Sequence, residues 1–98
     1  MYARVTTTPI SPYRMEEAIN LARDATLPAA SQQPGFKGYL MLVDRSSGTA
    51  LTITFWDDEA DRQLSGPNST YYKDSISKIV PLLTGAPAVE DFEVAVQV

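Results

Sequence analysis

The chain contains no cysteine and no histidine among its 98 residues. Without cysteine it can form no disulfide, thiolate metal site or iron–sulfur cluster, and it has no cysteine nucleophile. Without histidine it lacks the commonest metal ligand, the commonest general base near neutral pH and the usual proximal ligand of haem. Any chemistry must come from carboxylates, Tyr, Arg, Lys and hydroxyl groups, or from the reactivity of a bound molecule. We therefore expect neither a cofactor nor a metal.

Positive charge is scarce as well, because 8 Lys and Arg stand against 12 Asp and Glu, a net charge of −4. Nucleic acids and anionic membranes both require a surplus of Lys and Arg on one face. No apolar run approaches the roughly 18–20 residues that span a bilayer, and the N-terminus lacks the apolar core of a signal peptide. The length fits one domain, residues 1–98. We expect a cytoplasmic protein with no nucleic-acid or membrane partner.

Alternation of apolar and polar residues predicts four strands, and helical spacing predicts two helices. The first helix should bury Met15, Ala18, Ile19, Ala22 and Ala29 on one face. The second should begin at an Asp57 or Asp58 cap and be interrupted at Gly66-Pro67. The expected strands cover residues 2–8, 36–45, 49–56 and 89–98, and the expected helices cover 11–30 and the stretch from the acidic cap to Leu83.

The resulting order, β-α-β-β-α-β, is that of the α+β ferredoxin-like fold. It predicts a four-stranded antiparallel sheet with both helices on one face. Neither side of this sheet is polar enough for bulk water, and an exposed apolar patch of that size marks an interface. A second copy of the sheet is the simplest cover, so we expect a homodimer. One side would carry Ala3, Val5, Leu40, Leu42, Leu51, Ile53, Phe55, Val94 and Val96, and the other Tyr2, Arg4, Thr6, Tyr39, Met41, Val43, Thr52, Thr54, Trp56, Glu93, Ala95 and Gln97.

The stretch PGFKGYLMLVDRSSGTALTITFWDDEA, residues 34–60, resembles the core of the antibiotic-biosynthesis-monooxygenase (ABM) type of dimeric α+β barrel. The resemblance rests on the Pro34-Gly35-Phe36 start of the second strand, its Asp44-Arg45 end, and Trp56 before an acidic helix start. The element order and the closing FEVAVQV strand extend it over essentially the whole chain.

This resemblance implies two kinds of activity. Some members of the family oxygenate anthrones or quinols without metal or flavin, and others degrade haem with a histidine, a tryptophan and an asparagine. Trp56 matches the tryptophan of either group, but the histidine is absent and the first strand has no asparagine. The sequence therefore disfavours haem degradation and leaves a cofactor-free monooxygenase acting on a quinol or polyketide-like aromatic. The alternative is a non-catalytic ligand-binding or regulatory homodimer of the same fold.

No catalytic residue can be assigned from the sequence. Trp56 is either a pocket wall or core packing between the second helix and the sheet, and Tyr39 has the same two interpretations. Arg4 either holds a substrate anion or forms a structural ion pair with Glu93. The acidic run Asp57–Glu59 is explained by a helix start without a metal. The candidate pocket residues are Trp56, Tyr39, Thr52, Thr54, Arg4 and Tyr72.

Overall fold

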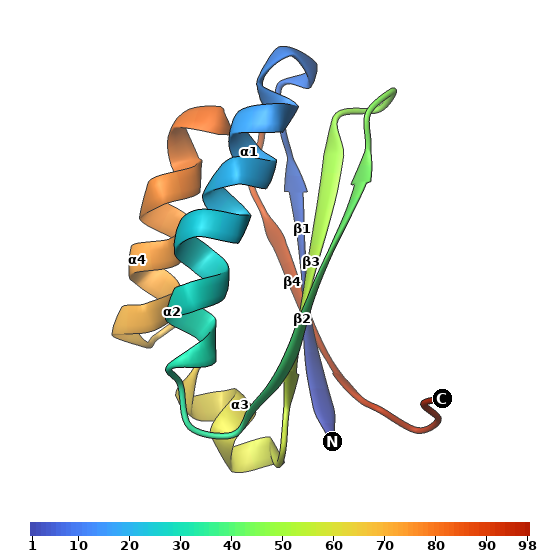
Figure 1. Cartoon of the computed structure of the whole chain (residues 1–98), viewed down its shortest axis with the longest axis vertical. Helices are drawn as coiled ribbons and strands as arrows, with labels where there is room; N and C mark the ends of the chain where they lie inside the picture. Colours follow the sequence, from blue (N-terminus) through green and yellow to red (C-terminus); the bar gives the residue numbers. More distant parts are fainter.

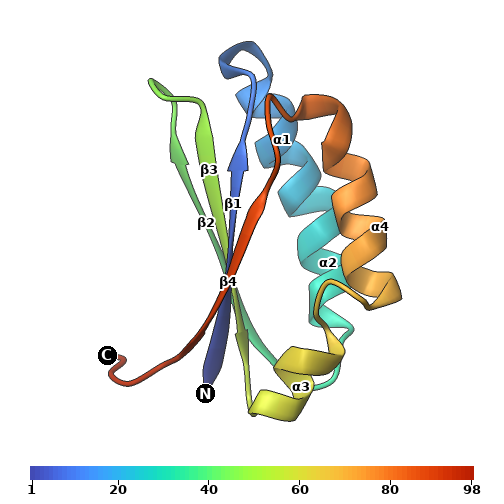
Figure 2. The same cartoon turned by 180° about the vertical axis from the view of Figure 1, so that it is seen from behind.

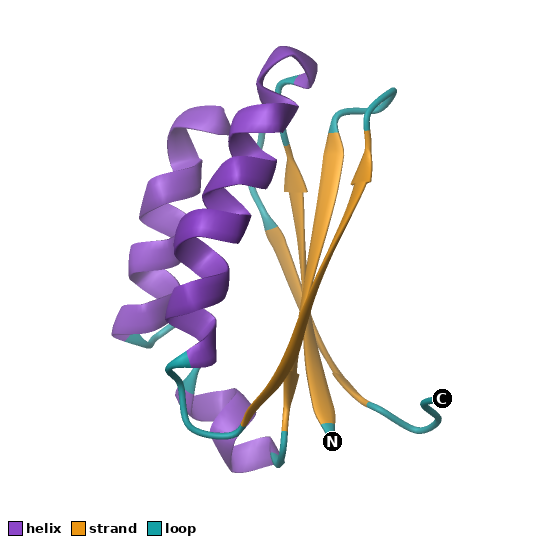
Figure 3. Ribbon diagram, viewed as in Figure 1, coloured by secondary structure: helices purple, strands orange, loops and turns teal.

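A single antiparallel sheet forms one layer of the molecule and helices form the other (Figures 1 and 3). The structure is a computed structural model that describes residues 1–98. The strand order β2-β3-β1-β4 places the first and last strands side by side. This is the expected ferredoxin-like arrangement, with both helical segments on one face. The strands are β1 (Tyr2–Pro9), β2 (Phe36–Asp44), β3 (Thr49–Trp56) and β4 (Ala88–Glu93).

The first helical segment changes its winding partway along. A 3-10 turn (Pro12–Arg14) leads into α1 (Met15–Leu21), a π-helical turn (Ala22–Thr26) and then α2 (Leu27–Ser31). Pro28 has no N–H to donate to the carbonyl four residues earlier, and a π turn accommodates such a break. The wider turn shifts the buried face by one residue. Ala30 is therefore fully buried where the sequence predicted Ala29, which is only half-buried.

The second helical segment is divided, as Gly66 and Pro67 predicted. It comprises α3 (Glu59–Leu64), α4 (Thr70–Ile79) and a 3-10 turn (Val80–Leu82). The Asp58 carboxylate accepts the Asp61 N–H at 2.8 Å, and the Ser69 hydroxyl accepts the Tyr72 N–H at 3.1 Å. Both are N-caps, so the acidic run after Trp56 serves as a helix start.

The two ends of the space between the layers are filled differently. Ile10, Met15, Ala18, Ala50 and Leu82 form a buried apolar cluster at the end where β1 finishes. The fully buried Trp56 closes the opposite end, where β3 finishes. No helix of the chain is both long and apolar enough to cross a membrane.

The far face of the sheet is bare, as the view from behind shows (Figure 2). The helices cover the side that carries Arg4, Thr54 and Trp56. The opposite side carries Leu40, Leu42 and Phe92, each nearly half exposed, and we call it the open face. Of the two sets separated by alternation, the one containing the threonines and Trp56 is therefore the inner one.

The last strand is shorter than expected. The sequence predicted a strand through Val98, but β4 ends at Glu93 and residues 94–98 have no regular structure. The Val94 N–H still donates to the Met1 carbonyl at 2.9 Å, and the chain then turns away from the sheet on the side opposite the helices (Figure 1). The last register pair between β1 and β4 is Tyr2 with Glu93.

Candidate functional site

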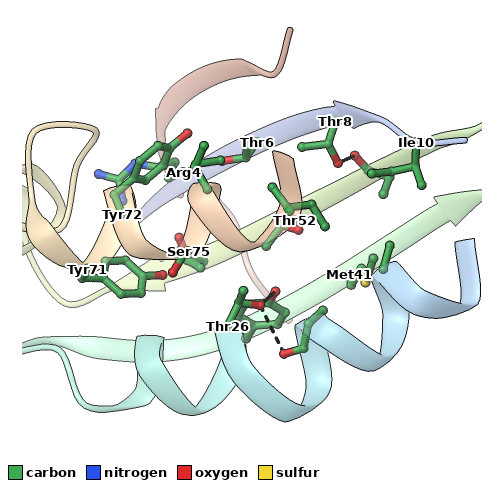
Figure 4. Close-up of a pocket in the computed structure, with 17 residues that line it drawn as sticks. Arg4, Thr6, Thr8, Ile10, Thr26, Met41, Thr52, Tyr71, Tyr72 and Ser75 are labelled. Atoms are coloured by element: carbon green, nitrogen blue, oxygen red, sulfur yellow. Dashed lines mark hydrogen bonds between the residues drawn. The ribbon is translucent and has the colours of Figure 1, made fainter. Parts of the chain in front are cut away.

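A cavity lies between the sheet and the helices, in the middle of the sandwich (Figure 4). It measures about 80 Å³ and is partly open to solvent. Side chains of β1, β2 and β3 form its floor, and side chains of α1, the π turn and α4 form its roof. Arg4, Tyr71 and Tyr72 lie toward one end and Ile10 and Thr8 toward the other.

Five of the six predicted pocket residues meet around this cavity. Strand register explains why, because Thr54 pairs with both Arg4 on β1 and Tyr39 on β2. These three side chains form one row across the inner face, and Thr52 belongs to the next row. Tyr72 reaches the same space from α4. The residues that line the cavity from the candidate set are Arg4, Tyr39, Thr52, Thr54 and Tyr72.

The floor of the cavity is built of threonines where a sandwich interior normally has valine or isoleucine. Thr6, Thr8, Thr52 and Thr54 all point toward the helices. Thr8 donates to the Ala50 carbonyl at 3.2 Å and Thr54 accepts from Trp56, but Thr6 and Thr52 form no hydrogen bond of good geometry in the protein. Neither oxygen is among the fully buried unpaired atoms, so both hydroxyls are open to the cavity. These hydroxyls therefore face a space suited to water or to a polar ligand.

Trp56 does not line the cavity. Its indole Nε1–H donates to the Thr54 hydroxyl at 3.0 Å, and its ring packs edge-on against Phe36 and Tyr71 at centroid distances of 6.0 and 6.4 Å. Of the two interpretations that the sequence left open, the geometry matches core packing. Trp56 reaches the cavity only through Thr54, whose hydroxyl it orients.

Arg4 is 3% exposed, and most of its guanidinium is already engaged. Nη1 donates to the Ser65 carbonyl and hydroxyl at 3.0 and 3.1 Å, and Nη2 donates to the Arg62 carbonyl. These carbonyls end α3, so Arg4 fixes that helix to β1. Its ion-pair partner is Asp91, at 3.5 Å from Nε, and Glu93 lies two residues farther along β4.

Arg4 also lies between two rings, with its guanidinium carbon 5.9 Å from the centroids of Trp56 and Tyr72. Burial lowers the pKa of Arg4, and Asp91 opposes that effect. An arginine with a reference pKa above 12 stays charged nonetheless. Arg4 therefore gives this end of the cavity a positive potential while offering few free donors.

Two tyrosines of α4 close the charged end of the cavity. The Tyr72 hydroxyl is buried and makes no hydrogen bond of good geometry, although the Thr6 hydroxyl lies close enough to lower its pKa as a weak hydrogen-bond partner. Burial raises the pKa of Tyr72, and burial raises the pKa of Tyr71 to about 12. Both phenols are protonated at neutral pH and can donate hydrogen bonds.

The π turn contributes a residue that sequence reasoning missed. Thr26 lines the roof of the cavity, and its hydroxyl lies 2.8 Å from the Tyr39 hydroxyl and 3.2 Å from the Ala22 carbonyl (Figure 4). A regular helix would place residue 26 at a different angle, so Thr26 reaches the cavity because of the π turn. The sequence signal that could have indicated it was Pro28.

A second hollow of about 380 Å³ lies between α2 and α4. Tyr71 and Ser75 line both spaces, so these two residues separate the inner cavity from the outer hollow. The hollow is polar, with Gln32, Gln33 and Lys78 on its walls. The candidate residues drawn from the sequence include neither Ser75 nor Tyr71.

No carboxylate lines the inner cavity. No group of three or more carboxylates elsewhere is placed to hold a metal ion. Proton transfer from a ligand would therefore have to use tyrosine or threonine hydroxyls, water, or the acidity of the ligand itself.

Comparison with known sequences gives relatives without an assigned function. The uncharacterized protein Rv2557 of Mycobacterium tuberculosis is 30% identical over 95 residues, which are 97% of this chain and 41% of that protein. Rv2558 of the same organism is 27% identical over 95 residues, 39% of its length. The chain thus spans about two fifths of the length of these curated relatives. No family model matches it.

Comparison with solved structures is more specific. A structure described as an antibiotic biosynthesis monooxygenase matches with a TM-score of 0.74 at 18% identity, over 97% of this chain and 99% of that one. The chain has the ABM fold. A monooxygenase from the gene ActVA-Orf6 of Streptomyces coelicolor, solved with nanaomycin D, matches with a TM-score of 0.76 at 18% identity over 99% and 89% of the two chains.

Another solved structure that matches this chain has no assigned activity. The protein NE2512 of Nitrosomonas europaea, of unknown function, gives a TM-score of 0.79 at 21% identity and covers 98% of this chain and 90% of its own. At these identities the comparison establishes the ABM fold alone. The role of each residue in this chain must be judged from that residue's own geometry.

Proposed function

We propose that this ABM-fold domain is a cofactor-independent monooxygenase of a flat, electron-rich aromatic such as a quinol or a polyketide-like ring. The ligand would bind in the cavity beside Thr54, with part of it in the outer hollow. The observation that carries the proposal is the floor of threonines, where the Thr6 and Thr52 hydroxyls face the cavity and form no hydrogen bond of good geometry within the protein. A purely structural core would gain from apolar residues at these positions.

The chemistry requires little from the protein. Loss of a proton from a hydroxylated ring leaves an electron-rich anion that can reduce dioxygen directly. The ring gives up one C–H and one O–H hydrogen, and with one dioxygen this yields a new ring C=O, a second C=O from the former hydroxyl and one water, so the substrate supplies all four electrons. The chain would hold the ring, exclude water and stabilise the anion. Tyr72 and the positive potential of Arg4 supply that stabilisation at one end of the cavity.

Volume constrains the ligand. The inner cavity, about 80 Å³, falls short of the roughly 300 Å³ typical of pockets for drug-sized ligands. A two-ring ligand needs both the cavity and the outer hollow of about 380 Å³, joined by a movement of the Tyr71 ring. The size therefore favours the smaller quinols, with one or two rings.

The test is oxygen consumption by the purified protein with a panel of quinols and naphthols. We expect uptake above the protein-free rate, and we expect Thr54→Val to reduce it. The matched control is Thr7→Val, because Thr7 lies on the same sheet with its side chain on the opposite face. Equal rates with and without protein across the panel would refute the proposal.

A specific observation favours the alternative function, a non-catalytic ligand-binding protein. The cavity has no carboxylate and the chain has no histidine, so no strong general base faces the ligand. Quenching of Trp56 fluorescence by a quinol, without oxygen consumption, would support this alternative.

We further propose that a second copy of the chain covers the open face. Leu40, Leu42 and Phe92 are nearly half exposed there, next to the half-buried Ile53 and Phe55. The apolar tail, residues 94–98, leaves the domain on that same side (Figure 2). A copy of the same sheet presents a matching apolar surface, which charged or polar partners would not. Sedimentation should show a dimer at micromolar concentration.

A further inference from the structure

The neighbours of the hydroxyl groups around the cavity favour particular hydrogen-bond directions. Thr26 has one hydroxyl hydrogen, and the Ala22 carbonyl at 3.2 Å can only accept it, so with that bond made the 2.8 Å contact between Thr26 and Tyr39 is a donation from the tyrosine. A phenol is also a better donor than an aliphatic alcohol, which favours the same direction. With its hydrogen engaged, the Tyr39 oxygen offers only lone pairs to the cavity.

Thr54 has the opposite direction. The Trp56 indole nitrogen can only donate, and it donates to the Thr54 oxygen at 3.0 Å. The Thr54 hydrogen has no acceptor in the protein, so it is free to donate to a ligand. The buried Tyr72 hydroxyl is unpartnered and adds a second donor at this end.

The donor and the acceptor are held at different heights in the cavity. Thr54 and Tyr39 are direct register partners, which sets their Cα atoms roughly 5 Å apart. The short threonine ends near the sheet, while the tyrosine extends to Thr26 on the helical layer. A ligand between them meets the Thr54 donor near the sheet and the Tyr39 acceptor beside Thr26 of the π turn.

We propose that the cavity selects an aromatic with a hydrogen-bond acceptor, a carbonyl or phenolate oxygen, at one end and a hydroxyl donor at the other. The carbonyl or phenolate oxygen faces Thr54 and Tyr72, and the hydroxyl faces Tyr39. Trp56 and Thr26 are positioning residues. Trp56 sets the hydrogen-bond direction of the Thr54 hydroxyl, and Thr26 sets that of the Tyr39 hydroxyl. This inference rests on the proposed function for the location of the ligand and goes beyond it in naming the ligand's polarity.

The experiment compares three single-ring probes, chosen because the cavity is small. Para-hydroxyacetophenone has both the donor and the carbonyl, para-methoxyacetophenone lacks the donor, and para-ethylphenol lacks the carbonyl. Affinity for the wild-type protein is measured by calorimetry and by Trp56 fluorescence. We expect para-hydroxyacetophenone to bind about tenfold more tightly than either of the others, the scale of one buried hydrogen bond.

The variants should change the two preferences separately. Tyr39→Phe should abolish the preference for the hydroxyl over the methoxy group and keep the preference for the ketone. Thr54→Val should weaken the preference for the ketone, to which Tyr72 still donates, and keep the preference for the hydroxyl group. Trp56→Phe should weaken only the preference for the ketone, as measured by calorimetry. Thr7→Val, outside the cavity, is the control.

Thr26 gives the sharpest test. In Thr26→Val the Tyr39 hydrogen loses its acceptor and turns to the cavity, so para-methoxyacetophenone should gain affinity relative to para-hydroxyacetophenone. Thr26→Ser keeps the hydroxyl and should therefore show the wild-type order of probe affinities. If Thr26 served only to pack the helix, the order of affinities would not depend on its hydroxyl.

Equal affinities for the three probes, or no binding of any, would overturn the inference. An unchanged order in Thr26→Val would overturn it as well. Oxygen consumption is measured separately, so ordered binding without oxygen uptake would refute the proposed monooxygenase and leave the inferred polarity standing.

Discussion

Thr6 and Thr8 offer a paired test of whether the threonine floor serves a ligand or the fold. They are 8% and 7% exposed, lie two residues apart on β1 and point to the same side of the sheet. They differ in one respect. Thr8 donates to the Ala50 carbonyl at 3.2 Å, whereas Thr6 faces the cavity with only the poorly aligned Tyr72 hydroxyl near it. Valine has nearly the same shape, so replacing each threonine changes mainly the hydroxyl.

The two substitutions should therefore have opposite signs. Thr8→Val loses a hydrogen bond and should lower the free energy of unfolding by about 1 kcal/mol. Thr6→Val removes an unpartnered hydroxyl, for which protein data give about 1–3 kcal/mol. We expect the lower end, a gain of ~1 kcal/mol, because the cavity can hold water beside Thr6.

Urea unfolding followed by Trp56 fluorescence measures both values, and quinol affinity should fall in Thr6→Val. A loss of stability in Thr6→Val as large as that in Thr8→Val would refute the reasoning. It would show that the Thr6 hydroxyl has a structural role in the interior.

Four further results are expected. Leu42→Glu, on the open face, should give a folded monomer by sedimentation, and a wild-type protein that is monomeric at high concentration would contradict the dimer. Trp56→Phe should cost somewhat less than the roughly 3–5 kcal/mol of truncation to Ala, measured by circular dichroism, and near-neutral stability would contradict core packing. The pKa of Tyr71, raised by burial to about 12 from a reference of about 10, means that unfolding releases its proton. Stability should thus be steady below about pH 10, fall between pH 10 and 12, and fall less in Tyr71→Phe. Haemin titration should give no stoichiometric Soret shift, because the chain has no histidine.

The element order and the sheet were predictable because strand alternation and helix caps are local signals. Asp58 and the Gly66-Pro67 break each act within a few residues, and each has the predicted role: a helix N-cap and a helix interruption. The π turn was not predictable, because it depends on how the chain relieves the missing N–H of Pro28. That one change moved the buried face from Ala29 to Ala30.

The cavity was predictable in part. Alternation grouped Arg4, Tyr39, Thr52 and Thr54 on one side of the sheet, and Tyr72 followed from the resumed helix. Trp56 belongs to the same side, but a fully buried ring at the end of β3 has no free face. Whether an aromatic at a strand end fills the core or borders a space depends on its neighbours from other elements, here Phe36 and Tyr71.

The most direct test of the central claim is to supply isotopically labelled dioxygen with a naphthol and to analyse the product by mass. The account predicts a quinone with one labelled oxygen per dioxygen consumed, formed by the wild-type protein and by Thr7→Val but much more slowly by Thr54→Val. A product without label, or labelled product formed equally fast without protein, would contradict it.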